Sequence, residues 1–307
     1  MKKIFFLILL SLCSSMLLKA QQPDFHAGFG NFPTPVEPDF KDVNYAGDDL
    51  EAHRLDIYLP KTEGKTFKAV IAIYGSAWFS NNMKGITYFS LGKPLIDAGF
   101  AVVCLNHRSS TDAKFPAQIE DVKGAIRFIR ANAAKFNIDA SFIGITGFSS
   151  GGHLSSLAGV TIGDEKLEGN IGGNLNVSSK VDAVVDWFGP VDMAHMNKCE
   201  GVNDEKSPEA VLIGGAPKDN PEKIAEISPV TYVSKLKNAP KFLVIHGDAD
   251  NVVPYCQSVN FSEELKKIGA LTEFITVPNG QHGPVTFNEE TYKKMTDFFK
   301  EQAQIQK

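Results

Sequence analysis

This 307-residue chain is poor in several of the patterns that mark common classes of protein. It has 31 Lys and Arg residues against 36 Asp and Glu residues, so its formal net charge is −5. A mildly acidic chain offers no broad attraction to nucleic acid or to anionic membrane surfaces. It also has no C-x-x-C or H-E-x-x-H spacing, no internal repeats and no low-complexity tract. We therefore expect no nucleic-acid partner, no stable membrane partner and no metal site.

Cysteine is scarce, with four residues in the whole chain. Cys13 lies in an apolar N-terminal run, and Cys104 lies within the apolar run Ala101–Leu105, where we expect a buried thiol. Cys199 and Cys256 could pair in an oxidising compartment. So sparse a count does not make a disulfide framework, and the sequence leaves the pairing open.

The N-terminus has the pattern of a secretory signal peptide. Two lysines precede the apolar run from Ile4 to Leu18, and the small residue Ala20 stands before Gln21. This predicts a signal peptide over residues 1–20, cleavage near Ala20, and a secreted or periplasmic protein. A lipoprotein signal at Cys13 and an uncleaved anchor are the alternatives. After residue 20 no stretch is long and apolar enough to span a membrane.

Residues 21–40 are predicted to form a polar, proline-rich arm, and residues 41–307 one α/β domain. Continuous apolar strands alternating with helices indicate a mostly parallel sheet covered on both faces. Strands are expected at Arg54–Leu59, Lys68–Tyr74, Ala101–Leu105, Ser141–Thr146, Val181–Asp186, Phe242–His246 and Thr272–Val277. Helices are expected at Tyr88–Ala98, Pro116–Phe136, from His153 onward, and at about Phe287–Gln302. The alternation breaks over residues 188–234, which we interpret as a small cap insertion above the site.

One motif stands out for its setting. The residues Gly147-Phe-Ser149-Ser-Gly151 follow a predicted strand and open a predicted helix. Strand, G-x-S-x-G and helix together indicate a nucleophile elbow, which exposes the serine hydroxyl at the edge of a sheet. Ser149 is therefore the candidate nucleophile, and a tight structural turn is the alternative.

A serine hydroxyl needs a histidine base, and the base needs a carboxylate. In sheet enzymes of this kind the order along the chain is serine, acid, histidine. Asp250 follows the strand that ends at His246, and His282 follows the last strand, between Gly280 and Gly283. Both loops lie at strand carboxyl ends, where open α/β sheets place their sites. We predict Asp250 as the acid and His282 as the base.

Other residues compete for both roles. Asp248 is the alternative acid, although it is suited to binding turn amides, and Asp186 and Asp192 are more distant candidates. Among the histidines, His246 is expected to support its loop, His153 to be structural, and His107 to be an outside candidate for the site. His26, His53 and His195 have no supporting context.

The oxyanion of an acyl-transfer reaction needs backbone donors. The amide of Ser150 is expected at the N-terminus of the elbow helix. The loop Tyr74-Gly-Ser76-Ala77-Trp78 follows a predicted strand, and its small residues would let the Ser76 and Ala77 amides approach a substrate oxygen. The alternative is an ordinary turn at a strand end.

These residues resemble the α/β-hydrolase esterases related to hormone-sensitive lipase. They are most similar to the branch of bacterial acetylxylan and feruloyl esterases. The resemblance covers most of the chain from about Arg54 onward, and it rests on Tyr74–Trp78, Phe115–Phe128, Gly147–His153, Phe188–Pro190, His246–Pro254 and Gly280–Gly283.

The resemblance implies an α/β-hydrolase fold with a mostly parallel central sheet, helices on both faces and a small cap. It implies Ser149 as nucleophile, Asp250 as acid, His282 as base, and Ser76, Ala77 and Ser150 as oxyanion donors, with no cofactor. The chain departs from the family loop His-Gly-Gly-Gly, because Ser76 and Ala77 occupy the second and third glycine positions.

We therefore expect a serine esterase acting on a small acyl ester or an acylated plant polysaccharide such as xylan, with acetyl before feruloyl groups. A serine peptidase of the prolyl-oligopeptidase type is one alternative, although such enzymes usually carry a large propeller before the hydrolase domain. The other is a non-catalytic carbohydrate-binding protein on a hydrolase fold.

Overall fold

The computed structural model describes residues 36–62 and 66–304. The predicted signal peptide, residues 1–20, and most of the predicted arm, residues 21–40, lie outside this described part. Within it, no helix has both the length and the apolar character needed to cross a membrane.

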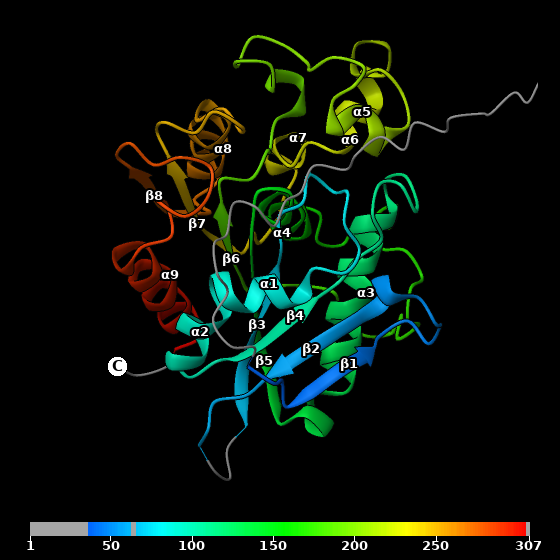
Figure 1. Cartoon of the computed structure of the whole chain (residues 1–307), viewed down its shortest axis with the longest axis vertical. Helices are drawn as coiled ribbons and strands as arrows, with labels where there is room; N and C mark the ends of the chain where they lie inside the picture. Colours follow the sequence, from blue (N-terminus) through cyan, green and yellow to red (C-terminus); the bar gives the residue numbers. More distant parts are fainter. Residues whose placement is uncertain (1–35, 63–65, 305–307) are drawn as a thin grey trace, which may run out of the picture. The chain divides into compact units, whose positions relative to one another are not determined.

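The described residues form one eight-stranded sheet in the order β1-β2-β4-β3-β5-β6-β7-β8 (Figure 1). β1 and β2 pair antiparallel at one edge, and β4, β3, β5, β6, β7 and β8 run parallel. The predicted α/β class with a mostly parallel sheet is thus confirmed. The strands are β1 (Phe40–Asn44), β2 (Arg54–Tyr58), β3 (Phe67–Ile73), β4 (Ala101–Leu105), β5 (Ile138–Phe148), β6 (Ala183–Trp187), β7 (Lys241–Gly247) and β8 (Leu271–Val277).

Helices cover both faces of the sheet, which explains why the central strands are apolar throughout. Gly144 of β5 lies against Phe299 of α9 (Glu289–Gln302). Val184 of β6 pairs with Ile145, the residue after Gly144 in β5. It lies against Gly159 of α4 (Ser150–Val160). Consecutive residues of a strand point to opposite faces, so α9 and α4 lie on opposite sides of the sheet. α3 (Ala117–Ala131) packs beside α4, and α2 (Lys93–Asp97) packs beside α9.

Two of the predicted helices are divided into shorter elements in the structure. The helix expected at Tyr88–Ala98 is a series of α1 (Lys84–Thr87), a π-turn η3 (Tyr88–Gly92) and α2. The helix expected at Pro116–Phe136 ends at Ala131 and continues as a 3₁₀ turn, η4 (Ala133–Phe136). A 3₁₀ turn, η2 (Glu51–His53), precedes β2.

The insertion over residues 188–234, here called the insert, contains only short helices. They are η5 (Met193–His195), α5 (Pro208–Ile213), η6 (Pro217–Asp219), α6 (Pro221–Glu226) and α7 (Val230–Val233). α5 begins where proline follows Ser207, whose hydroxyl accepts from the Ala210 amide, as helix starts favour. Figure 1 shows α5, α6 and α7 grouped together in yellow and yellow-green.

The insert is fastened to α8 (Cys256–Lys267), the helix after the Asp250 loop. A disulfide joins Cys199 of the insert to Cys256, which answers the pairing that the sequence left open. The buried side chain of Gln257 accepts from the Val191 and Asp192 amides and donates to the Asp192 and His195 carbonyls. The first turn of α8 therefore holds the start of the insert through one covalent bond and four hydrogen bonds.

Candidate active site

Ser149 occupies a sharp turn between β5 and α4. Its backbone angles are φ 55° and ψ −125°, a conformation that side chains disfavour and that is often found at functional sites. A Cβ added to Gly151 would lie 2.3 Å from the Ile73 carbonyl oxygen, and one added to Gly147 would lie 2.4 Å from Gly151. Glycine at these two positions therefore permits the close approach of helix and strand that leaves the Ser149 side chain partly exposed.

The structure brings the predicted serine, histidine and aspartate into one hydrogen-bonded chain. His282 Nε2 lies 2.9 Å from Ser149 Oγ, and His282 Nδ1 lies 2.7 Å from Asp250 Oδ2. The three residues follow the carboxyl ends of β5, β7 and β8, which is the edge where sites of open α/β sheets form. This order of hydroxyl, imidazole and carboxylate is the arrangement that activates a serine.

Two glycines bring the acid and base loops together. A Cβ added to Gly247 at the end of β7 would lie 2.2 Å from the Gly280 carbonyl oxygen. One added to Gly280 would lie 2.8 Å from Gly247 Cα. Only backbone fits between the two loops. Gly283, on the other side of His282, has φ 126°, which favours glycine.

Asp250 is held as a carboxylate. Its Oδ1 accepts from the Val252 and Val253 amides at 2.8 and 2.9 Å, and its side chain is fully buried. Burial raises the pKa of Asp250, but hydrogen bonds from His246, His282 and the backbone outweigh burial and hold that pKa far below its usual value. Asp250 is therefore ionised throughout the neutral range.

The rival acids have other partners. Asp248 is exposed and accepts from the Asn279 amide, which is the turn role considered for it. Asp186 is buried and accepts from Ser156 Oγ and the Gly189 amide, and burial raises its pKa to about 6. Asp192 pairs with His195 at 2.7 Å.

The other histidines also have distinct positions. His246 is fully buried, with Nδ1 2.7 Å from Ser258 Oγ. Its Nε2 lies 3.1 Å from the Val253 carbonyl and 3.3 Å from Asp250 Oδ2, so it supports the acid as well as its loop. His153 is fully buried between Trp78 and Ile227. His107 bonds to the Arg108 carbonyl and stacks on Tyr74, and no hydrogen bond among the described residues joins it to Ser149 or His282. His53 pairs with Asp48 and Asp121, and His26 lies outside the described part of the chain.

Two of the three predicted oxyanion donors have amides without an acceptor among the described residues. The Ser76 amide donates to Ser150 Oγ at 2.9 Å. In the part of the chain that the structure describes, no hydrogen bond uses the amides of Ala77 or Ser150. Ser150 is the first residue of α4, where helix N–H groups have no partner within the helix and attract negative charge.

An aromatic cluster that the sequence motifs did not predict as part of the site lies beside the base. The ring of Phe188 meets the His282 imidazole nearly edge-on, with centroids 4.8 Å apart, and it also contacts Phe148 and Phe287. Phe188 is buried and has φ 43°. The sequence signal that could have placed Phe188 at the site is its position in Phe-Gly-Pro, directly after the carboxyl end of β6. This packing limits the rotation of the imidazole on one side.

The fold and this serine–histidine–aspartate arrangement define an α/β-hydrolase. Residues 55–265 match the BD-FAE family, and the chain belongs to that family. The expected membership among hormone-sensitive-lipase-like esterases is thereby confirmed.

Two solved structures are similar over most of the chain. One is a bifunctional GH43-CE protein of Bacteroides eggerthii, 60% identical, with a TM-score of 0.84, covering 86% of this chain and 35% of that one. The other is a truncated carbohydrate esterase from gut microbiota, 55% identical, with a TM-score of 0.85, covering 89% of this chain and all of that one.

Among curated proteins, the chain is similar to esterase LipC of Mycobacterium tuberculosis. The two are 33% identical over 239 residues, which make up 77% of this chain and 58% of LipC. The chain thus spans little more than half the length of the curated relatives it matches first.

Proposed function

We propose that the protein is a serine carboxylic-ester hydrolase that works through an acyl-enzyme at Ser149. The hydrogen-bonded chain Ser149–His282–Asp250 is the observation that supports this most directly. The carboxylate is buried and ionised, the imidazole reaches the hydroxyl at 2.9 Å, and the serine sits in a strained turn. The family membership supports the same reaction class.

In this mechanism Ser149 Oγ attacks the ester carbonyl carbon while His282 Nε2 takes the hydroxyl proton. Asp250 stabilises the imidazolium that forms. The tetrahedral intermediate collapses, the C–O bond to the alcohol breaks, and His282 gives the proton to the leaving alkoxide. Water then attacks the acyl-enzyme with His282 again as base, and the carboxylic acid leaves with Ser149 restored.

The negative oxygen of each tetrahedral intermediate would be held by the amides of Ala77 and Ser150. Both amides lack an acceptor within the described chain, which is the condition for binding an incoming oxyanion. The Ser76 amide, also predicted as a donor, is bonded to Ser150 Oγ in this structure. We assign Ser76 the role of joining the loop to the elbow helix.

The proposed substrate is a small acyl ester on a plant polysaccharide, acetyl first and feruloyl second. Two relatives at 55 and 60% identity are described as a carbohydrate esterase and as a bifunctional GH43-CE protein. Side chains at Ser76 and Ala77, where the family loop has glycines, favour a short acyl group. Acetylated xylan is therefore the substrate to test first.

We also propose that the protein is exported, because residues 1–20 have the pattern of a signal peptide. The Cys199–Cys256 disulfide supports this, since such bonds persist in oxidising compartments. A polysaccharide is too large to enter a cell readily, so an exported enzyme suits the proposed substrate.

The experiment that tests the substrate is acetate release from acetylated xylan by the wild type and by Ser149→Ala. We expect release by the wild type and none by the variant, with chemically deacetylated xylan as the blank. Hydrolysis of simple alkyl esters alone would contradict the proposed polysaccharide substrate but not the proposed esterase reaction. Cleavage in a peptide panel would instead support a serine peptidase, and glycan binding without turnover of any ester a binding protein.

A further inference from the structure

The loop beside the nucleophile adopts a glycine-like backbone without using glycine. We call residues 74–79 the oxyanion loop. Ala77 has φ 49° and Trp78 has φ 62°, both in the left-handed region that disfavours side chains, most strongly a bulky one such as tryptophan. Side chains remain in such conformations only where their surroundings hold them there. Contacts outside the loop must therefore stabilise this geometry.

Trp78 has those contacts. Its side chain is buried, its indole Nε1–H donates to His153 Nδ1 at 3.1 Å, and its carbonyl accepts from the Ser110 amide at 2.7 Å. The indole and imidazole rings meet edge-on with centroids 5.1 Å apart. The side chain and the carbonyl of Trp78 are thus both fixed. The amide of the preceding residue, Ala77, has no acceptor in the described part of the chain.

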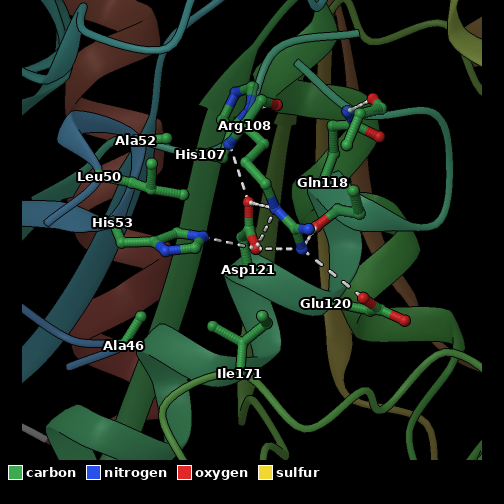
Figure 2. A network of polar contacts seen from close by, with 12 residues as sticks. Ala46, Leu50, Ala52, His53, His107, Arg108, Gln118, Glu120, Asp121 and Ile171 are labelled. Atoms are coloured by element: carbon green, nitrogen blue, oxygen red, sulfur yellow. Dashed lines mark hydrogen bonds and ion pairs between the residues drawn. The ribbon is translucent and has the colours of Figure 1, made fainter. Parts of the chain in front are cut away.

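The loop that holds the Trp78 carbonyl is itself anchored. Arg108, two residues before Ser110, bonds to the fully buried carboxylate of Asp121 through its backbone amide and its guanidinium. Figure 2 shows the Asp121 carboxylate between Arg108 on one side and His53 on the other, with contacts to both. The Ser110 amide is therefore a fixed donor.

His153 connects three parts of the molecule. It lies in the first turn of α4, where its amide donates to the Ser149 carbonyl at 3.0 Å. Its Nε2–H donates to the carbonyl of Ile227 in the insert at 2.7 Å, while Nδ1 accepts from Trp78. One acceptor and one donor require a neutral ring with its proton on Nε2. Burial supports this state by lowering the pKa of His153 to about 4.

We propose that His153 is a positioning residue of the active site. Through the Trp78 indole it keeps the Ala77 amide in the geometry that receives the oxyanion, and through Ile227 it fixes that geometry to the insert. This inference rests on the proposed esterase function. Glycine at positions 76 and 77 would leave the loop free to move, and here the indole–imidazole bond takes the place of an intrinsically permissive backbone.

The sharpest test is Trp78→Phe, because it removes the indole N–H while keeping an aromatic ring in the buried site. We expect kcat for 4-nitrophenyl acetate to fall about 10- to 100-fold, less than or comparable to the loss of a whole oxyanion donor, with KM within about twofold. The control is Trp187→Phe, since the Trp187 indole is buried and its N–H has no partner among the described residues. That control should keep wild-type kcat.

A second pair of variants separates positioning from folding. His153→Leu should lower kcat as Trp78→Phe does. His153→Asn keeps an amide oxygen that can accept from the indole and an N–H that can donate, so it should recover part of the loss. The double variant Trp78→Phe/His153→Leu should lose no more than the worse single variant, because each single variant already removes the indole–imidazole bond. Affinity for a boronic acid that forms a tetrahedral adduct at Ser149 should weaken in parallel with kcat.

The outcomes separate this inference from the proposed function. If the wild type shows no Ser149-dependent hydrolysis, the proposed function fails and this inference fails with it. If the wild type is active and a folded Trp78→Phe keeps its kcat, the positioning role alone is overturned. A lower kcat accompanied by a changed KM and a lower melting temperature, with no recovery by His153→Asn, would also overturn it. Such a result would show that the Trp78–His153 pair only stabilises the fold.

Discussion

At the residue scale, the chemistry depends on how each side chain of the site is supported. Ser149, His282 and Asp250 form one hydrogen-bonded chain, yet the acid has a second imidazole partner in His246. Motif order along the chain predicted which three residues would meet. It could not predict that the Ser76 amide would bond to Ser150 Oγ, because that depends on side-chain orientation across two segments 74 residues apart.

His246 provides a prediction at this scale. Its hydrogen bond contributes to the low pKa of Asp250, so removing it should raise that pKa. Activity requires ionised Asp250. The carboxylate also loses a group that fixes its position beside His282. We therefore expect kcat to be about 10-fold lower in His246→Leu at neutral pH, where Asp250 is still ionised. His246→Asn, which keeps a donor, should lie between this variant and the wild type. Equal kcat values for all three proteins would contradict a role through Asp250.

At the element scale, the loops at the carboxyl ends of β5, β7 and β8 assemble the site, and the insert is fastened beside them. The strands from Arg54 onward were predicted because they are continuous apolar or alternating runs. β1 was not predicted, since its five residues include Lys41 and Asp42 and are only partly buried at a sheet edge. α8 was not predicted. Its sequence, Cys256–Lys267, gave no recognised motif, and its role became visible only through the insert residues that it holds.

The Cys199–Cys256 disulfide gives the prediction at this scale. It closes a loop across a sequence separation of 57 residues, for which the chain-entropy model gives a stabilisation of about 4 kcal/mol. We expect Cys199→Ser/Cys256→Ser to lower the free energy of unfolding by about 2–4 kcal/mol. Dithiothreitol should lower the melting temperature of the wild type but not that of the variant. Equal sensitivity to the reductant would show that the disulfide does not contribute to stability in solution.

At the scale of the whole molecule, stability depends on a carboxyl buried at the centre of the fold. Burial disfavours the charge of Asp186 and raises its pKa to about 6, well above the usual value of an aspartate. The folded state thus binds this proton more tightly than the unfolded state. Its contribution to stability is complete below about pH 4 and is lost as pH rises through about 6, a change of about 3 kcal/mol.

Asp186→Asn should remove this dependence, since an amide can keep contacts to Ser156 and Gly189 without ionising. We expect the free energy of unfolding of the wild type to fall relative to the variant between pH 4 and pH 7. Urea denaturation at several pH values measures this difference. A constant difference across that range would show that Asp186 does not titrate in the folded protein.

The proposed mechanism requires Ser149 to be the nucleophile of an ester hydrolase. The measurement that tests it most directly is hydrolysis of 4-nitrophenyl acetate by the wild type and by Ser149→Ala, purified side by side. We expect turnover by the wild type and a loss of at least about a thousandfold in the variant. If the two proteins are equally slow, Ser149 is a structural turn and the proposed mechanism is wrong.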